Sequence, residues 1–423
     1  MRTFSFLVLC LMGFFFMACD DDENRLGDWA LGSAWPGEVR NQAVCFVIDD
    51  YAYVGLGIGI NGAEYTNFRK MNLNTGYWTV DSVAPFPGKG RHAAVAFAVN
   101  GKAYVGTGFR VAVNWGDEQY NREYLYDFWE YDPSGTTTED GVTYQGKWTR
   151  AADFPHQDSA SNNGGGRRDA IAFAFDSEEY PEYGNYGYVG LGRGYNDVVY
   201  NDFYVFNPNT TTQNEDGTSG VGSWSVVRSS EGDGYIGNPR YGASVFIVDG
   251  SAYICLGAED GSTRSTENIK FTPDGNGGGI FELMQALTEK PDNKQDADYD
   301  RIPRAYAVAF TSNAGKDGQT YGYIAGGKGT NYQTVWRYDH IRDRWHQVEN
   351  MASTSTPVGG VAFSVRPNGG NYTYGMYTTM GGSLDQTTSA TLSSQSWWFF
   401  PDIKEWRGND YTNTPVGQYR YGN

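Results

Sequence analysis

Residues 91–108 read RHAAVAFAVNGKAYVGTG. Apolar and polar-or-small side chains alternate up to Phe97, which is the period of a β-strand with one buried face. Asn100 and the glycine after it supply the two positive-φ positions of a tight turn. A second strand follows, in which Tyr104 stands four residues before Gly108. The stretch therefore predicts a β-hairpin, and nothing in it has the 3.6-residue period of a helix.

This hairpin recurs six times along the chain. In each copy an apolar strand reaches a phenylalanine, a Tyr-x-x-x-Gly strand follows, a third strand alternates apolar side chains, and a bulky aromatic residue ends the unit. The phenylalanines are Phe46, Phe97, Phe173, Phe246, Phe310 and Phe363, and the last aromatic residues are Trp78, Trp148, Trp224, Phe281, Trp345 and Trp406. Such repetition indicates one supersecondary unit that buries its apolar face only against its neighbours.

Six copies of four short antiparallel strands predict an all-β protein, a six-bladed β-propeller. Phe46 and Phe97 are 51 residues apart, close to the roughly 50-residue period of kelch repeats, and longer intervals elsewhere indicate loop insertions. The chain resembles six-bladed kelch propellers, in the fold class of galactose oxidase and the bacterial sialate mutarotases. It departs from the kelch pattern because, at the end of the second strand, a clean Gly-Gly doublet occurs in only two copies, at residues 326–327 and 381–382.

We expect the propeller to span residues 29–423, with blades at about 40–88, 89–156, 165–228, 238–290, 302–350 and 357–407. The strand that closes the ring stays open. Trp29, followed by Trp35-Pro-Gly, resembles Trp78, followed by Phe86-Pro-Gly. The sixth unit already has its own Trp406, so Trp29 either adds a fifth strand or takes the place of Trp406.

The first residues predict export. Arg2 precedes an apolar run that is too short to span a bilayer as a mature helix. The run ends in Phe-Met-Ala-Cys19, which resembles a bacterial lipoprotein box with Phe in place of the usual Leu. We therefore expect residues 1–18 to be a signal peptide, Cys19 to carry the lipid and residues 19–28 to be an acidic tether. An ordinary signal peptide with a chance cysteine is the alternative.

The acidic run directly after Cys19 resembles the surface-export signal of Bacteroidota-type lipoproteins. It predicts a lipid-anchored outer-membrane protein on the cell surface, and a solvated tether without any signal is the alternative. The formal net charge of −18 repels nucleic acid and anionic membrane surfaces. We therefore expect no nucleic-acid partner and membrane attachment through the N-terminal lipid only. The mature cysteines, Cys45 and Cys255, lie in non-adjacent copies with two repeats between them and are expected to be free thiols.

An arginine stands six residues before the phenylalanine in five of the six copies. These residues are Arg40, Arg91, Arg167, Arg240 and Arg304, and the sixth copy has Pro357 at this position. If the first strands line the axis, five guanidiniums approach one mouth of the channel. Because guanidiniums match carboxylates and phosphates bidentately, the pattern predicts an anion-recognising channel mouth. The alternative is that each arginine pairs within the blades and fixes the link between them.

The loops between second and third strands reach the same face and carry aromatic side chains. The predicted contact residues are Trp115, Tyr120, Tyr195 and Tyr332, and Tyr65, Tyr124 and Tyr200 lie in related loops. Aromatic rings offer flat, rigid surfaces to sugars or protein partners. Packing of these rings on one another is the alternative.

Catalytic and metal-binding motifs are sparse. Galactose-oxidase chemistry needs two histidines, two tyrosines and a cysteine around copper, whereas the four histidines of this chain lie in separate places. Asp296-x-Asp298-x-Asp300 lacks the glycine and terminal glutamate of an EF-hand and indicates a solvated loop. We predict no cofactor and no metal. No catalytic residue of the sialate mutarotases can be matched individually.

The sequence thus predicts a cell-envelope lipoprotein whose propeller binds a ligand or partner without changing it. The partner is an envelope protein or a glycan, an anionic one if the arginines contact it. The alternative is a sialate-mutarotase-like enzyme acting on an acidic sugar. A purely structural part of an envelope assembly is a third hypothesis, because propellers carry unrelated functions.

Overall fold

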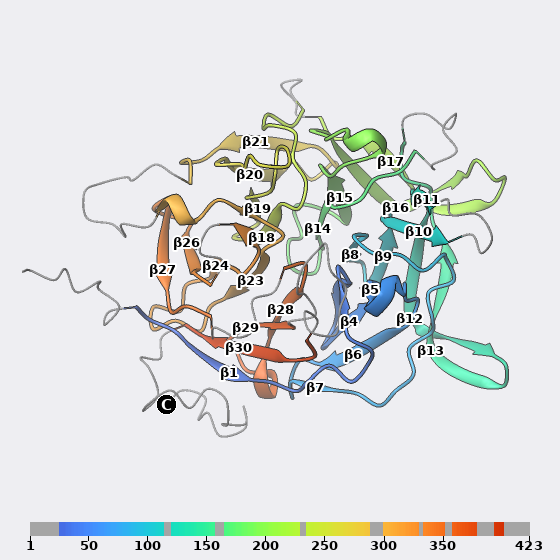
Figure 1. The fold of residues 1–423 in the computed structure, drawn as a ribbon, viewed down its shortest axis with the longest axis horizontal. Coiled ribbons are helices and arrows are strands. Elements are labelled where there is room, and N and C mark those ends of the chain that lie inside the picture. Colours follow the sequence, from blue (N-terminus) through green and yellow to red (C-terminus); the bar gives the residue numbers. More distant parts are fainter. Residues whose placement is uncertain are drawn as a thin grey trace, which may run out of the picture.

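The computed structural model of the 423-residue chain describes residues 25–113, 120–156, 165–228, 234–287, 299–329, 333–351, 358–378 and 393–401. Six four-stranded antiparallel sheets follow one another around a common axis (Figure 1). The predicted all-β fold with six blades of four strands is confirmed. The proposed signal peptide and Cys19 lie outside the described residues.

The blades are numbered in chain order. Within each blade, the strands are given from the innermost, next to the axis, to the outermost. Blade 1 contains β3 (Val44–Ile48), β4 (Tyr51–Gly55), β6 (Phe68–Asn72) and β7 (Tyr77–Trp78). Blade 2 contains β8 (Val95–Val99), β9 (Lys102–Gly106), β12 (Phe128–Glu139) and β13 (Val142–Arg150). Blade 3 contains β14 (Ile171–Phe175), β15 (Tyr186–Gly190), β16 (Phe203–Gln213) and β17 (Ser219–Val226).

Blade 4 contains β18 (Ser244–Val248), β19 (Ser251–Cys255), β20 (Asn268–Pro273) and β21 (Gly279–Leu283). Blade 5 contains β23 (Val308–Ser312), β24 (Tyr321–Ala325), β26 (Val335–Asp339) and β27 (Arg344–Val348). Blade 6 contains β28 (Val361–Val365), β29 (Tyr374–Thr378), β30 (Ser396–Phe400) and, outermost, β1 (Asp28–Leu31).

The position of β1 answers the question of ring closure. It pairs antiparallel with β30, and Trp29 is the partner of Phe399. The Trp29 side chain is 1% exposed, and its ring centroid lies 4.7 Å from that of Phe399. Blade 6 therefore joins an N-terminal strand to three C-terminal strands, which ties the two ends of the ring together by hydrogen bonds. Trp406, the alternative, lies outside the described residues.

The repeated phenylalanine belongs to the contact between neighbouring blades. In blade 2, Phe97 stacks on Tyr104 of the adjacent strand, with ring centroids 5.4 Å apart. On its other side it fills the space left by Gly187 in β15 of blade 3, where an added Cβ would overlap the Phe97 ring. The same contact joins Phe246 to Gly322 and Phe310 to Gly375. Burying such a ring stabilises the fold by roughly 1.5–3 kcal/mol per blade.

The glycine of the Tyr-x-x-x-Gly strand also serves the contact between blades. Gly57 has φ of +94°, and an added Cβ would lie 2.7 Å from the Asn41 carbonyl oxygen. Its N–H donates to the Arg91 carbonyl of the next blade at 2.8 Å. Equivalent 2.8 Å bonds run from Gly108 to Arg167 and from later copies to Arg240 and Arg304. Only glycine combines this backbone conformation with so close an approach.

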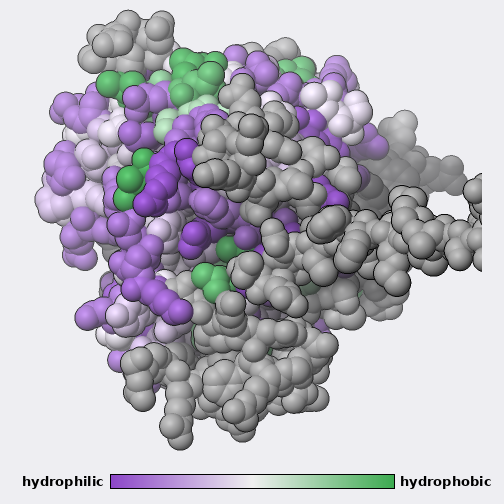
Figure 2. Space-filling view, turned by 90° about the vertical axis from the view of Figure 1, so that its left-hand side faces the viewer, coloured by the Kyte–Doolittle hydropathy of each residue, from purple (hydrophilic) through white to green (hydrophobic). Residues whose placement is uncertain are grey.

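The ring has two faces, which carry different connections between the strands. The loop face carries the starts of the first strands and the loops between second and third strands. The turn face carries the connections between first and second strands, such as Asp49-Asp50. On the side of the ring seen in Figure 2, the described side chains are mostly hydrophilic and the hydrophobic ones form small separate groups. Within the described part of the chain, no helix is long and apolar enough to cross a membrane.

Candidate functional site

The five predicted arginines lie on the loop face, but each guanidinium is directed into its own blade. All five residues are at most 5% exposed. Arg91 donates to both carboxylate oxygens of Asp127 at 2.7 and 2.8 Å and to the Thr107 carbonyl at 3.1 Å. The Phe86 ring lies 4.9 Å from this guanidinium. Arg91 therefore joins the start of the first strand to the loop before the third.

The other four arginines repeat this arrangement with different partners. Arg167 holds Asp202, Arg240 holds Glu267, Arg40 holds Asn67, and Arg304 holds the backbone and side chain of Thr334. Burial lowers the pKa of Arg40 and of Arg304 to about 10. These contacts favour the alternative in which each arginine pairs within the blades. Ligand binding by these five residues stays a prediction. Because they are buried, they offer a ligand little accessible surface.

A closed ring of backbone hydrogen bonds surrounds the axis on the loop face. It is formed by the residue four positions before each repeated phenylalanine, and every member has positive φ. Each N–H donates to the carbonyl of the equivalent residue in the preceding blade, at 2.7–3.2 Å. We call this set the axial ring: Gln42, Ala93, Asp169, Gly242, Tyr306 and Gly359. Because the ring takes one residue from each blade, it fixes the blades relative to one another.

Large and small side chains alternate around the axial ring. Gln42, Asp169 and Tyr306 come from blades 1, 3 and 5, whereas the residues between them are alanine or glycine. The Gln42 amide donates to Asp169 Oδ1 at 3.0 Å, and the Tyr306 hydroxyl donates to Asp169 Oδ2 at 3.3 Å. Side chains from alternate blades meet only near the axis. These three therefore cross the channel at the level of the axial ring.

Two further arginines converge on Asp169 from blade 3. Arg193 Nε donates to Asp169 Oδ2 at 2.9 Å, and Arg168 Nε lies 3.4 Å from the same oxygen. Backbone hydrogen bonds of 2.9 Å in both directions join Arg168 to Arg193, which places them side by side. The Asp169 side chain is 1% exposed, whereas both arginines are 19% exposed. The cluster thus has two guanidiniums for one buried carboxylate.

The surroundings of the cluster favour the charged form of Arg193. Burial by itself would lower the pKa of Arg193, but Asp169 beside it raises that pKa above its ordinary value. The Tyr241 ring lies 4.3 Å from the Arg193 guanidinium, and the Phe109 ring lies 4.5 Å from that of Arg168. Arg168 Nε is buried and has no hydrogen-bond partner among the described residues. Nε itself is closed to a ligand, but the Arg168 side chain is 19% exposed, so part of it is open to an anion.

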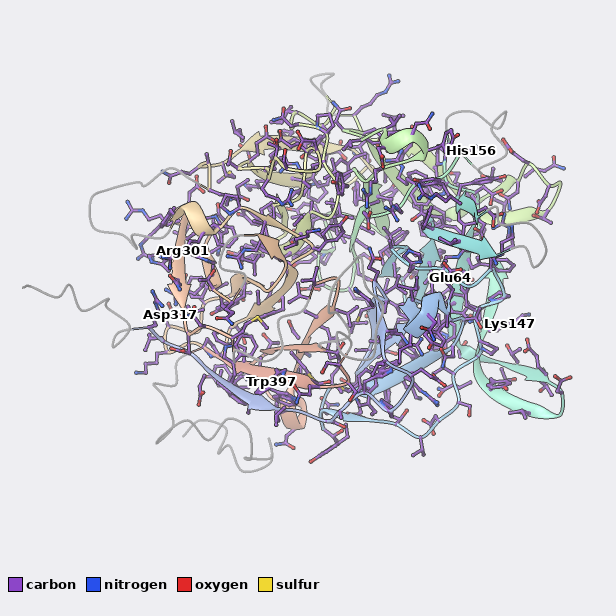
Figure 3. All side chains as sticks on the ribbon, in the orientation of Figure 1. Glu64, Lys147, His156, Arg301, Asp317 and Trp397 are labelled. Atoms are coloured by element: carbon purple, nitrogen blue, oxygen red, sulfur yellow. The ribbon has the colours of Figure 1, made fainter. Side chains whose placement is uncertain are left out.

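A second charged group lies beside the cluster in the loops of blades 1 and 2. Glu64 Oε1 is 3.1 Å from His92 Nδ1, and Glu64 Oε2 is 3.7 Å from Arg110 Nε. Figure 3 shows Glu64 near β10 (Phe109–Val113), well inside the outer hairpin that carries Lys147. The loop face thus combines arginines, a histidine and carboxylates close to the axis. No group of three or more metal-ligating side chains is placed to hold a metal within the described ranges.

The predicted aromatic contact residues have mixed outcomes. Tyr195 is 42% exposed, and its ring lies edge-on to that of Tyr124 with centroids 6.5 Å apart. The rings of Tyr65 and Tyr200 lie 4.1 and 4.2 Å from the guanidiniums of two buried arginines, Arg40 and Arg167. Trp115, Tyr332 and the Tyr120 side chain lie outside the described residues. Tyr195 is thus the member of the predicted set whose exposure the structure shows.

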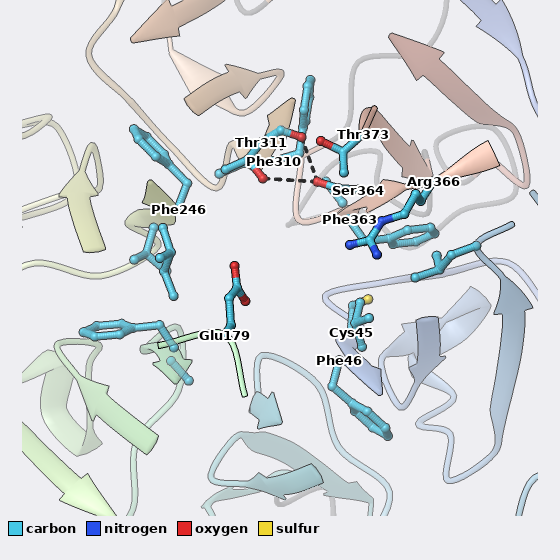
Figure 4. A pocket seen from close by; sticks show the side chains of 18 of the residues that line it. Cys45, Phe46, Glu179, Phe246, Phe310, Thr311, Phe363, Ser364, Arg366 and Thr373 are labelled. Carbon is cyan, nitrogen blue, oxygen red and sulfur yellow. Dashed lines mark hydrogen bonds between the residues drawn. The ribbon is translucent and has the colours of Figure 1, made fainter. Parts of the chain in front are cut away.

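A cavity of about 470 Å³ occupies the axis on the opposite side of the ring and opens to the turn face. Its walls come from the middle and end of first strands in five blades, including Cys45, Ala309 and Ala362. Glu179 and Arg366 project into its opening from blades 3 and 6 (Figure 4). The sequence did not single out either residue, because both stand in connections of irregular length. Burial raises the pKa of the Cys45 thiol to about 12.

Comparison with other proteins supports the fold alone. No protein-family model matches the chain, and no protein of curated function matches it. Among solved structures, that of a protein named YjhT superposes with a TM-score of 0.54 at 14% sequence identity. The match covers 86% of this chain and 95% of that one. The chain is therefore similar to YjhT in architecture, and the likeness carries no information on its chemistry.

Proposed function

We propose that this propeller is a non-catalytic binding module that holds an anionic ligand on its loop face. The observation that carries the proposal is the convergence of Arg168 and Arg193 on one buried carboxylate, Asp169. Asp169 balances one of the two positive charges. The other has only a weak partner, Asp197, whose 84% exposed carboxylate lies 3.9 Å from Arg193 Nη1. A carboxylate or sulfate group of a ligand would supply the second negative charge and accept hydrogen bonds from partly exposed guanidiniums.

The charge of the whole protein strengthens this argument. At a formal net charge of −18, general electrostatic attraction to anions is absent, so an anionic ligand needs a local cluster of cations. Arg110 lies nearby, but its Nε is 3.7 Å from Glu64 Oε2 and 3.8 Å from Glu123 Oε2, so Arg168 and Arg193 are the cations on which the proposal rests. Tyr195, which is 42% exposed, offers aromatic surface beside the cluster. Acidic glycans combine these features, because they carry carboxylates on rings whose faces stack on aromatic side chains.

We further propose that the propeller is held at the outer membrane by a lipid on Cys19. This part rests on the sequence, in which the lipoprotein-box-like Phe-Met-Ala-Cys19 is followed by an acidic run. Metabolic labelling with a radioactive fatty acid tests it, with Cys19→Ala as the control. Labelling that persists in this variant would contradict lipidation at Cys19.

A glycan array of matched acidic and neutral glycans tests the binding proposal. We expect binding to acidic glycans that weakens at least ten-fold in Arg193→Gln and falls as salt concentration rises. Arg342→Gln is the matched control, because Arg342 is 65% exposed and pairs with Asp339 in a turn of blade 5. Preference for neutral glycans, or unchanged binding by Arg193→Gln, would contradict the proposal.

An enzyme acting on an acidic sugar is the second candidate, favoured by one contact. The Tyr306 hydroxyl donates to the buried carboxylate of Asp169 and lies 3.4 Å from an Arg193 nitrogen. Such a group is placed to exchange a proton with a sugar bound to the arginines. Nuclear magnetic resonance of α-sialic acid, with and without protein, follows its conversion to the other anomer. Acceleration that is lost in Tyr306→Phe would support the enzyme, and no acceleration over buffer would exclude this activity.

A further inference from the structure

The cavity on the turn face is separate from the loop-face cluster. Its walls are formed by the middle and end of first strands, whereas the axial ring precedes these strands. The side chains of Gln42, Asp169 and Tyr306 cross the axis between the two regions. Whatever enters the cavity therefore enters from the turn face. At about 470 Å³, the cavity is within the range of about 300–1,000 Å³ that small-molecule sites occupy.

The walls of this cavity are apolar or small because of the alternation within the first strands. In each first strand the phenylalanine position packs into the blade, and the positions on either side of it face the axis. Cys45, Val47, Ile247, Ala309 and Ala362 contribute the wall at such positions. Thr311 and Ser364 also line the cavity, but hydrogen bonds between blades 5 and 6 engage them. Ser364 Oγ donates to the Thr311 carbonyl at 2.7 Å. The interior therefore suits an apolar group.

The opening, in contrast, carries charges of both signs. Arg366 reaches in from blade 6 and forms no hydrogen bond or ion pair through its side chain with any residue the structure describes. Its backbone N–H is held by the Leu73 carbonyl at 3.1 Å, and Pro367 follows it in a short 3-10 turn. Glu179 reaches in from blade 3 (Figure 4). Asp49 and Asp50 of blade 1 also line the cavity.

The position of Glu179 is fixed by the turn that carries it. The Glu179 N–H donates to the Asp176 carbonyl at 3.1 Å, and the N–H of the next residue donates to the same carbonyl at 2.7 Å. Tyr180 packs against Phe175, and burial together with the Glu179 carboxylate raises the pKa of Tyr180. The opening thus presents a carboxylate and a guanidinium from different blades that do not pair with each other.

We propose that this cavity is a second binding site, for an α-amino acid or short peptide with an apolar side chain. A guanidinium binds a carboxylate, a carboxylate binds an ammonium group, and the two groups here face one opening from different blades. A zwitterion satisfies both at once, while its side chain occupies the apolar channel between the first strands. The excess of carboxylates at the opening favours a ligand whose ammonium group is free.

Titration calorimetry of the full chain in detergent with the dipeptide alanyl-leucine tests this proposal. Two analogues each lack one charge: N-acetyl-alanyl-leucine has no ammonium group, and alanyl-leucinamide has no carboxylate. We expect the free dipeptide to bind at least ten-fold more tightly than either analogue. Arg366→Gln should weaken the dipeptide at least ten-fold and leave the affinity for the amide unchanged. Glu179→Gln should also weaken the dipeptide at least ten-fold, but it should leave the affinity for N-acetyl-alanyl-leucine, which has no ammonium group, unchanged.

Both replaced side chains are exposed, so the variants are expected to fold, and Arg342→Gln on the same face is the control. Absence of binding by the unmodified chain at millimolar dipeptide would overturn the proposal. Equal affinity for the dipeptide and both analogues, or unchanged affinity in Arg366→Gln, would overturn it as well. Neither result bears on the loop-face cluster, whose binding of acidic glycans is measured separately.

Discussion

Arg167 and Arg168 are neighbours in the chain, yet replacing each by alanine is expected to have opposite consequences. Arg167 donates to the Leu191 carbonyl at 2.9 Å and to both carboxylate oxygens of Asp202 at 2.5 and 2.9 Å. Its side chain is 6% exposed, and the Tyr200 ring lies 4.2 Å away. Arg168 makes one ion pair at 3.4 Å and is 19% exposed.

The expected magnitudes follow from these contacts. Removing one partner of a buried ion pair costs about 3–5 kcal/mol. Asp202 is 26% exposed and can be partly rehydrated, so the lower end, about 3 kcal/mol, applies to Arg167→Ala. For a propeller of roughly 400 residues, an unfolding entropy of about 2.1 cal/mol/K per residue converts this into a melting temperature about 4 °C lower. Arg168→Ala should cost less than about 1 kcal/mol, or about 1 °C.

Differential scanning calorimetry gives the melting temperatures, and the glycan array gives binding by the same two variants. We expect Arg167→Ala to melt about 4 °C lower while acidic glycans still bind, and Arg168→Ala to keep its melting temperature while binding weakens. Equal melting temperatures for the two variants would refute the bracing contacts assigned to Arg167. If Arg167→Ala lost glycan binding and Arg168→Ala kept it, the result would indicate that the five buried arginines bind the ligand.

Three further outcomes test other parts of the structure. Trp29→Ala empties a site that is 1% exposed and should lower the free energy of unfolding by about 3–5 kcal/mol; an unchanged melting temperature would argue against β1 as the closing strand. Burial opposes ionisation of Asp127, but Arg91 holds its pKa below the ordinary value. The ion pair therefore stabilises the folded protein above about pH 4, and this stabilisation is lost as the pH falls below that value. We expect the melting temperature of Asp127→Asn to fall less between neutral and acidic pH than that of the unmodified protein. Burial raises the pKa of Cys45 and Cys255 to about 12, so iodoacetamide at pH 8 should alkylate both slowly until the protein unfolds; fast native alkylation of Cys45 in peptide mass spectrometry would contradict this.

The spacing from the repeated phenylalanine places several arginines on the loop face, but the sequence does not distinguish a buried arginine from an accessible one. Arg167 stands six residues before Phe173 and Arg168 stands five before it. In the folded protein the Arg167 guanidinium is directed into blade 3, to Asp202, and the Arg168 guanidinium is directed toward Asp169 at the axis. The sequence does carry a signal for the axial ring: its six members all stand four residues before the phenylalanine, and two of them are glycines. Glycine at a repeated position indicates positive φ.

The repeated unit is readable from the amino-acid sequence without a structure. Alternation of period two, the Asn-Gly and Asp-Gly turns and the six phenylalanines act within one blade or between adjacent blades, so they are readable as a local pattern. Two features become visible only in the folded ring: the strand that closes it and the side chains that meet at its axis. Asp169 and Tyr306 are 137 residues apart, and Glu179 and Arg366 share an opening from blades 3 and 6. Such pairs depend on the angle each blade occupies around the closed ring, which no local periodicity encodes.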